Sequence, residues 1–239
     1  MNNLECIILA AGFGKRMLPL TNLIPKPLIE INNKSLLQYH LDELYKINTS
    51  KIVITNYWKG NKIKEKFKNI ENQYKIIYSN EKEILGVGGG INKAIKNLET
   101  SDYFVVINGD IYIPNFNYNE FEDIINELHI ENNKKINNDE ILAFLYLVSN
   151  PDTNKKGDFY LDNEIIRYFD EENNSNKYTF SGIAIYHINF FKNLEKDKIY
   201  DLLPLLKIAI NKKLVKGKLY RGEWHDVGTI NKLNQLNKL

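Results

Sequence analysis

Short apolar segments alternate with longer amphipathic segments in the first half of the chain, and this alternation constrains the fold most strongly. Segments with the length and the Ile, Val and Tyr content of strands are residues 4–9, 51–55, 74–78 and 103–107. Between them, apolar side chains recur at helical spacing in residues 35–46, 61–70 and 90–98. The order β-α-β-α-β-α-β predicts an α/β fold with a mostly parallel central sheet and helices on both faces.

The second half of the chain has a different pattern, which begins after Asp110. Residues 119–131 and 199–211 have helical spacing, and a further helix is expected at the C-terminus. Strands are expected at residues 141–148, 157–161, 164–169, 179–186, 214–220 and 224–227. Because the first four of these follow one another without long crossovers, we expect a mixed sheet with a small antiparallel subregion, within one domain that covers residues 1–239.

Composition excludes several classes of protein. The chain of 239 residues has 32 Lys and Arg against 30 Asp and Glu, a net charge of +2, so a nucleic-acid partner is not expected. One cysteine, Cys6, provides neither a disulfide framework nor a cysteine-rich metal site. No stretch approaches the roughly 18–20 apolar residues of a membrane span, and the first residues do not resemble a signal peptide. We therefore expect a cytoplasmic protein with no membrane partner.

The segment after the first strand has the small residues and cations of an anion-binding loop. Gly12 and Gly14 permit close backbone approach, and Lys15 and Arg16 follow them directly. Lys26 lies between two prolines that stiffen the backbone on both sides. The loop lacks the ending of a P-loop and the third glycine of a dinucleotide fingerprint. Taken alone, the loop after the first strand is also consistent with an ordinary βα turn, and the segment around Lys26 with a plain surface loop.

Taken together, several motifs resemble those of the sugar-phosphate nucleotidylyltransferases. They are the segments 9–21 (LAAGFGKRMLPLT), 25–31 (PKPLIEI), 85–90 (LGVGGG), 108–110 (NGD), 180–183 (FSGI) and 224–229 (WHDVGT). The resemblance implies a GT-A-like, Rossmann-like nucleotidyltransferase fold. It also implies Mg²⁺-dependent joining of a nucleoside triphosphate to a sugar 1-phosphate, with release of pyrophosphate. Residues 1–118 would then form a nucleotide-binding half and residues 119–239 a sugar-phosphate-binding half.

Within that family, the chain looks most like the uridylyltransferases that act on N-acetylmuramate 1-phosphate in peptidoglycan recycling. The segments 157–159 (GDF) and 203–206 (LPLL) carry this finer resemblance, although Gly86 and Val87 stand where those enzymes have Glu and Thr. UTP and N-acetylmuramate 1-phosphate are therefore the expected partners of a monomer or small homo-oligomer. The alternatives are a guanylyl- or cytidylyltransferase for mannose 1-phosphate, heptose 1-phosphate or choline phosphate, and a non-catalytic regulatory homologue.

The resemblance also assigns roles to the charged residues. Asp110 and Asp226 would hold Mg²⁺, although both also suit turns beside glycine. Arg16 would bind the β- and γ-phosphates, and Lys26 would lie near the α-phosphate and the sugar phosphate. Because the nucleophile is already anionic, catalysis requires positioning and charge neutralisation instead of a strong base. Retention of these four residues favours an enzyme over a regulatory homologue.

The remaining site residues are also carried over from the resemblance. The nucleotide would contact Leu9, Ala10, Ala11, Gly12, Gly14, Lys15, Glu81, Gly86 and Asn108. The sugar phosphate would contact Asp158, Glu171, Ser181, Gly182 and Arg221. For Glu81 the alternative is a solvated loop carboxylate, and for Arg221 it is an ordinary exposed side chain.

Overall fold

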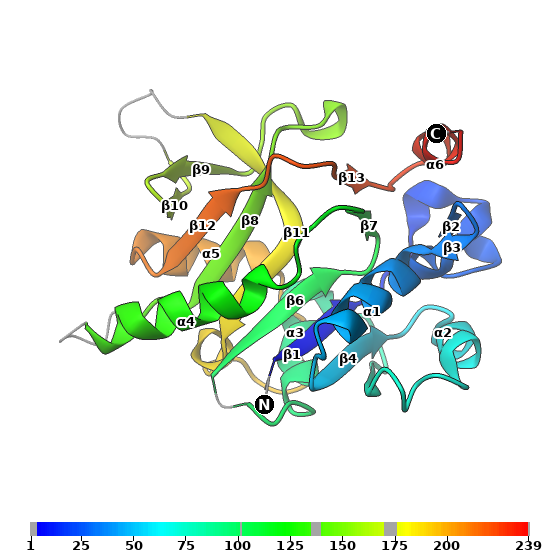
Figure 1. Ribbon diagram of the computed structural model, residues 1–239, viewed down its shortest axis with the longest axis horizontal. Coiled ribbons are helices and arrows are strands. Elements are labelled where there is room, and N and C mark those ends of the chain that lie inside the picture. Colours follow the sequence, from blue (N-terminus) through cyan, green and yellow to red (C-terminus); the bar gives the residue numbers. More distant parts are fainter. Residues whose placement is uncertain (1–3, 101, 135–139, 170–175, 239) are drawn as a thin grey trace.

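A nine-stranded sheet forms the centre of the molecule (Figure 1). The computed structural model describes residues 4–100, 102–134, 140–169 and 176–238. The strands lie in the order β5-β4-β1-β6-β11-β8-β12-β10-β9. Their bounds are β1 Glu5–Leu9, β4 Lys51–Asn56, β5 Ile76–Asn80, β6 Tyr103–Asn108, β8 Ala143–Val148, β9 Phe159–Asp162, β10 Ile165–Arg167, β11 Lys177–His187 and β12 Val215–Leu219.

The sheet is mixed, as the sequence predicts. Strands β5, β4, β1 and β6 are parallel, whereas β11 pairs antiparallel with both β6 and β8. From β1 the chain proceeds outward to β4 and β5 and then returns to the other side of β1 as β6. Strand order therefore reverses between β1 and β6. Ligands of open α/β sheets bind at the carboxyl ends of the strands at such a point.

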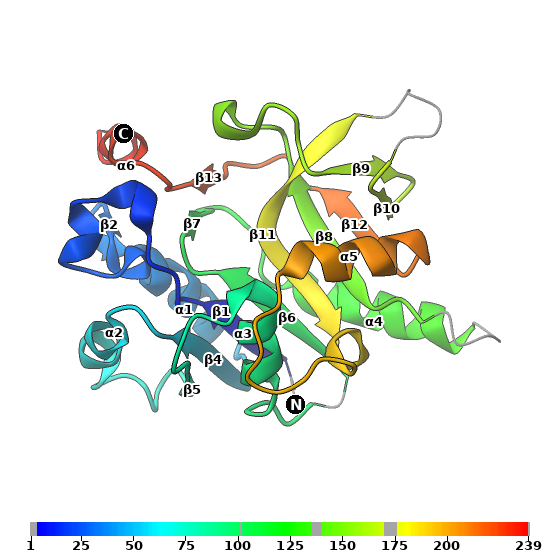
Figure 2. The same ribbon diagram turned by 180° about the vertical axis from the view of Figure 1, so that it is seen from behind.

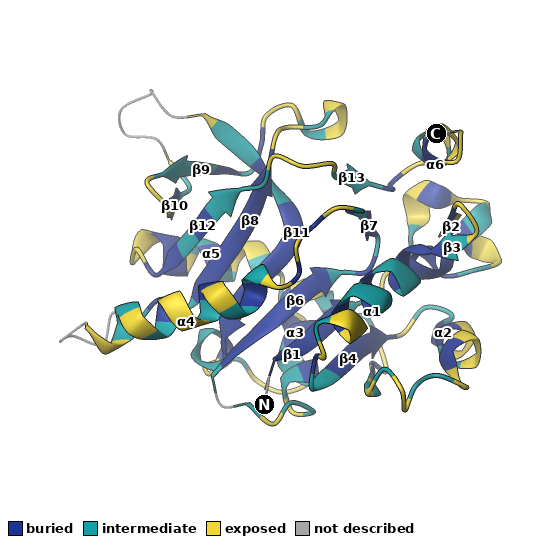
Figure 3. Ribbon diagram, in the orientation of Figure 1, coloured by how far each residue is buried: buried dark blue, intermediate teal, exposed yellow. Residues whose placement is uncertain are grey.

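Helices cover both faces of the sheet. One face packs against α1 (Leu36–Lys46), α2 (Gly60–Phe67) and α4 (Glu120–Asn133). The other face packs against α3 (Gly86–Ile95) and α5 (Leu202–Asn211), which are in front in Figure 2. Burial follows this layering, since the central strands are buried and the outer faces of α4 and α5 are exposed (Figure 3). Within the described residues, no helix combines the length and apolar character needed to cross a bilayer.

Smaller elements surround the carboxyl ends of β1 and β6. They are the two-stranded pairs β2 (Glu30–Ile31) with β3 (Lys34–Ser35) and β7 (Ile111–Tyr112) with β13 (His225–Asp226), the helix α6 (Ile230–Leu236), and short 3₁₀ turns. A third apolar cluster joins α6 to the segments around Met17 and Ile29. The C-terminal segment therefore packs beside the loop that follows β1.

The observed helix α3 differs most from the sequence prediction. It begins at Gly86, four residues before the predicted start at residue 90. Glycine is a poor helix former, so propensity alone points to a later start. The structure shows why glycine is needed here: a Cβ atom on Gly89 would lie 2.4 Å from the carbonyl oxygen of Lys198. Close packing against the segment before α5 therefore outweighs the local preference.

Candidate active site

The loop after β1 is fixed by hydrogen bonds to neighbouring segments. The Ala10 N–H donates to Thr55 Oγ1 at the end of β4, at 2.9 Å. The Thr21 hydroxyl donates to the Gly14 carbonyl at 3.0 Å. Gly14 has φ of +63°, and a Cβ atom there would lie 2.8 Å from Thr21 Cγ2, so conformation and space both require glycine. The loop is thus a fixed cradle beside the cations that follow it.

Lys26 brings two carboxylates together. It begins a 3₁₀ turn, Lys26–Leu28, and only 6% of its surface is exposed. Its Nζ atom lies 2.6 Å from Asp110 Oδ2 and 3.2 Å from Asp226 Oδ1. The two acids are distant in the sequence, and the structure places both within reach of one ammonium group. Arg16 extends this cluster, because its Nη2 atom lies 3.2 Å from Asp226 Oδ2.

Pairing of β7 with β13 explains how the two carboxylates meet. Asp110 follows β6 and immediately precedes β7, and Asp226 lies directly opposite Ile111 in the antiparallel pair. The backbone therefore sets the separation of the two side chains. Both side chains also reach solvent, with exposed fractions of 36% for Asp110 and 26% for Asp226. A ligand can therefore approach them.

His40 supports this arrangement from within the core. Its Nε2 atom lies 3.1 Å from the Ile111 carbonyl and its Nδ1 atom 2.7 Å from the Tyr118 hydroxyl. Because a carbonyl can only accept, Nε2 carries the hydrogen and Nδ1 accepts from Tyr118. Burial lowers the pKa of His40 to about 4, so the ring is neutral near neutral pH. The neutral His40 ring thus holds Ile111, which is the first residue of β7 and the chain neighbour of Asp110.

We expect His40 to make the stability of the protein depend on pH. Its pKa is lower in the folded protein than in the unfolded chain, so below about pH 6.5 the unfolded chain binds a proton that the folded chain excludes. The free energy of unfolding should therefore fall as the pH decreases from 6.5 toward 4, by up to about 3 kcal/mol from this group. Urea unfolding of wild type and His40→Gln at about pH 7 and about pH 4.5 measures this contribution. Equal losses in both proteins would contradict it.

A cavity of about 420 Å³ opens between the β1 loop and α3. Its lining includes every residue expected on the nucleotide side: Leu9, Ala10, Ala11, Gly12, Gly14, Lys15, Glu81, Gly86 and Asn108. Arg16, Lys26 and Asp110 line the same cavity. Glu81 is buried, and its Oε2 atom accepts from the Leu85 N–H at 3.0 Å. Burial raises the pKa of this carboxyl group above its usual value.

A second cavity, of about 270 Å³, lies on the other side of the acids. It shares Arg16, Asn108 and Asp110 with the first cavity and is also lined by Asp226 and Ser181. The sequence analysis missed several further lining residues: Thr153, Asn154, Thr179, Phe180 and Trp224. Trp224 donates from Nε1 to the Ser181 carbonyl at 2.8 Å, which links the C-terminal segment to β11. The motifs at 180–183 and 224–229 contain Phe180 and Trp224, whereas Thr153, Asn154 and Thr179 lie outside every sequence motif.

The other residues expected on the sugar side lie in different settings. Asp158 organises the wall of the second cavity, because its carboxylate accepts from Phe180 N–H at 2.8 Å and from Asn154 Nδ2 at 2.9 Å. Gly182 has φ of +86° and packs against Asn108, where a Cβ atom would meet the amide at 2.7 Å. Arg221 is exposed and lines neither of these cavities. Glu171 lies outside the described residues.

The two converging carboxylates suit a hard divalent cation. Mg²⁺ prefers oxygen ligands and is commonly held by one or two carboxylates together with phosphate oxygens and water. Asp110 and Asp226 provide such a pair. Among the described residues, no group of three or more His, Cys, Asp or Glu side chains could hold a metal. The donor set therefore fits a cation whose coordination is completed by substrate phosphates and water.

Comparison with known proteins identifies the family of the chain. The sequence profile described as Nucleotidyl transferase matches residues 5–239. The chain belongs to this family. The transferase is 32% identical over 99% of its length to an N-acetylmuramate alpha-1-phosphate uridylyltransferase of Neisseria meningitidis serogroup B, and the match covers 98% of that protein.

Two further relatives show the spread of the family. A D-glycero-alpha-D-manno-heptose 1-phosphate guanylyltransferase of Campylobacter jejuni is 37% identical over 46% of the transferase and 48% of its own chain. A crystal structure of a putative glucose-1-phosphate thymidylyltransferase from Bacillus anthracis, in complex with a sucrose, superposes with a TM-score of 0.74. The superposition covers 98% of the transferase and 94% of the Bacillus protein, at 20% sequence identity. This similarity confirms the predicted α/β fold.

Proposed function

We propose that the transferase joins UTP to N-acetylmuramate 1-phosphate, giving UDP-N-acetylmuramate and pyrophosphate. The observation that carries the proposal is the convergence of Asp110 and Asp226 on Lys26 between two cavities. The match to the meningococcal uridylyltransferase over nearly the whole of both chains supports the choice of substrates. A cytoplasmic role in peptidoglycan recycling follows as part of the same proposal.

The proposed chemistry is an in-line displacement at the α-phosphorus of UTP. A phosphate oxygen of the sugar 1-phosphate forms the new P–O bond. The bond from the α-phosphorus to the bridging oxygen of pyrophosphate breaks, and that oxygen keeps the electron pair. Both reactants are anions, so the site must overcome their repulsion and hold them in line. No proton has to be removed from the nucleophile, which agrees with a site rich in cations.

Two cations have distinct positions for this reaction. Lys26 is buried, lines the first cavity, and contacts Asp110 and Asp226, which both line the second cavity. Arg16 is more exposed, with 63% of its side chain accessible, and lines both cavities. We propose that Lys26 neutralises the α-phosphate and the incoming phosphate, and that Arg16 binds the departing pyrophosphate. Asp110 and Asp226 would hold Mg²⁺, which when bound neutralises further negative charge on the phosphates.

The two cavities give the proposed halves of the chain separate roles. The first is lined mainly by residues before position 118 and would hold the nucleotide. The second is lined largely by residues after position 150, including Asn154, Ser181 and Trp224, and would hold the sugar phosphate. Because Asp110 lines both cavities, a nucleotide in the first and a sugar phosphate in the second would lie on either side of the proposed metal site. This proximity is what the reaction requires.

A pyrophosphate-release assay tests the proposed substrates. Purified protein is incubated with Mg²⁺ and each combination of UTP, GTP, CTP or dTTP with N-acetylmuramate 1-phosphate, N-acetylglucosamine 1-phosphate, mannose 1-phosphate or a heptose 1-phosphate. We expect the highest kcat/KM with UTP and N-acetylmuramate 1-phosphate, and no release when Mg²⁺ is replaced by EDTA. A preference for another pair would overturn the substrates and keep the chemistry. No turnover with any pair would favour a regulatory homologue.

Guanylyl transfer is the second candidate, and Glu81 is the observation that favours it. An ionised carboxylate only accepts hydrogen bonds. Guanine offers two neighbouring N–H donors on its Watson–Crick edge, whereas uracil offers one. The similarity to the Campylobacter guanylyltransferase over 46% of this chain points the same way. A higher kcat/KM with GTP than with UTP would support this candidate.

A further inference from the structure

A third cavity lies away from Asp110 and Asp226, between the C-terminal half of α3 and the segment that follows β11. Its volume is about 430 Å³, which is within the usual size range of small-molecule sites. It is lined by Asn92, Lys93, Ile95, Lys96, Ile188, Asn189, Phe191, Lys192, Leu194, Lys196 and Asp197. None of these residues lines either cavity of the proposed active site. We call it the lysine cavity.

Charge in the lysine cavity is strongly one-sided. Four lysines and one aspartate give its lining a net charge of +3, although the whole protein carries only +2. Asp197 pairs with Lys93, whose side chain is only 12% exposed. Lys93 lowers the pKa of the Asp197 carboxyl group, and Lys96 and Lys82 contribute to the same shift. Several ammonium groups therefore make the electrostatic potential around Asp197 positive.

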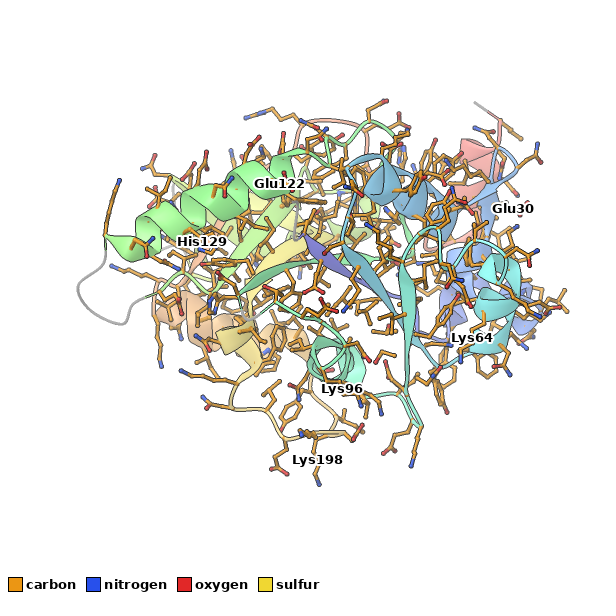
Figure 4. All side chains as sticks on the ribbon, turned by 60° about the horizontal axis from the view of Figure 1, so that its bottom comes forward. Glu30, Lys64, Lys96, Glu122, His129 and Lys198 are labelled. Atoms are coloured by element: carbon orange, nitrogen blue, oxygen red, sulfur yellow. The ribbon has the colours of Figure 1, made fainter. Side chains whose placement is uncertain are left out.

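The other three lysines of the cavity form no ion pair in the part of the chain that the structure describes. They are Lys96, directly after α3, and Lys192 and Lys196 on the segment after β11, and all three are exposed. Figure 4 turns this side of the molecule forward and labels Lys96 after α3 and Lys198 on the segment that leads to α5. Holding these like charges together costs free energy, which a bound anion would offset.

The floor of the lysine cavity is apolar. Phe191 is buried, and Ile95, Ile188 and Leu194 are partly buried beside it. Inorganic ions gain nothing from such a surface, whereas a ring or other apolar group does. Asn92 and Asn189 also line the cavity, although Asn92 Nδ2 already donates to the Glu195 carbonyl and Asn189 Nδ2 to Glu140 Oε2. The lining therefore combines ammonium groups for a phosphate with an apolar surface for an attached group.

We propose that the lysine cavity binds a phosphorylated small molecule that carries a ring, such as a nucleotide, as a site separate from the catalytic one. Helix α3 is common to both places. Gly86, Val87 and Gly90 line the catalytic cavity, and Asn92, Lys93, Ile95 and Lys96 line the lysine cavity. A ligand in the lysine cavity thus contacts the helix that forms a wall of the nucleotide cavity. This inference does not depend on the substrates proposed above.

Methyl NMR can test the proposal because the two cavities contain different isoleucines. Protein labelled at the isoleucine δ1 methyl groups is titrated with uridine 5′-monophosphate. Ile95 and Ile188 report on the lysine cavity, and Ile84 reports on the catalytic cavity. We expect the Ile95 and Ile188 signals to shift saturably with the monophosphate and not with uridine, which lacks the phosphate. The interpretation of the Ile95 and Ile188 shifts does not depend on whether the Ile84 signal also shifts.

Matched variants separate specific binding from general attraction to lysines. In the double variant Lys192→Gln/Lys196→Gln, the dissociation constant read from Ile95 and Ile188 should rise at least about tenfold. Any Ile84 response should be unchanged. The control double variant Lys212→Gln/Lys213→Gln removes two exposed lysines outside the cavity and should bind as wild type does. Unmoved Ile95 and Ile188 signals in wild type, or equal shifts in both double variants, would overturn the proposal.

Discussion

Replacing Lys26 by alanine is expected to lower kcat by about 10²–10³-fold and to leave the protein folded. Its ammonium group is the one cation that contacts both Asp110 and Asp226 among the described residues. It is also buried and lines the first cavity, so water screens it less than a surface charge. Without it, the two reacting phosphates and two carboxylates lack a central positive charge. The fold should persist because both acids still reach solvent.

The Lys26 prediction is checked by pyrophosphate release with the best substrate pair and by thermal unfolding of the same preparations. Lys26→Met is a second variant, because its unbranched side chain fills the space of the lysine stem without the charge. Lys66→Ala serves as the control, since Lys66 pairs with Glu30 on the surface and both are about half exposed. Turnover close to wild type in a folded Lys26 variant would remove this residue from the reaction.

Replacing Asp110 or Asp226 by asparagine should reduce turnover about as much as the loss of Lys26 does. Asp110→Asn and Asp226→Asn keep the shape of the side chain and remove the charge that would hold Mg²⁺. The stabilisation of phosphate charge by a bound cation is worth several kcal/mol, so a fall in kcat of about 10²–10³-fold is expected. The Mg²⁺ concentration for half-maximal activity should also rise. If Asp110 and Asp226 are metal ligands, removing either one would weaken the proposed metal site as well as the reaction.

A direct measurement of metal binding separates this role from others. Mn²⁺, which also takes oxygen ligands, can be titrated against the protein and followed by electron paramagnetic resonance in the absence of substrates. Both amide variants should bind it more weakly than wild type. Asp162→Asn is the control, because Asp162 pairs with Arg167 at a partly exposed position away from the acids. Unchanged Mn²⁺ affinity in both amide variants would contradict a metal site at Asp110 and Asp226.

The fold could be predicted largely because hydrophobic periodicity is a local property. The alternation of strands and helices up to residue 107 indicates the parallel part of the sheet, and the structure confirms it. Element ends were less predictable where tertiary contacts decide them. Helix α3 begins at Gly86 because its glycines pack against the backbone at Lys198 and Tyr200, and no sequence window contains that contact.

The candidate site likewise contains residues that local sequence reveals and residues that only tertiary contacts bring together. Residues of the β1 loop are contiguous, so resemblance places them together and the structure brings them to one cavity. The meeting of Asp110 with Asp226 depends on the pairing of β7 and β13, which spacing along the chain cannot reveal. Thr153 and Asn154 lie outside every sequence motif, so their place in the second cavity is visible only in the structure. His40 was detectable only as part of the apolar stripe of α1, and its bond to the Ile111 carbonyl becomes visible only in three dimensions.

The two-residue ladder between β7 and β13 has a consequence for incomplete chains. A polypeptide that ends before Trp224, either still being synthesised or cut by a protease, can already contain the glycine loop and Lys26 and still lacks the second acid. The pairing that brings Asp226 beside Asp110 therefore forms only after the C-terminal segment has been synthesised.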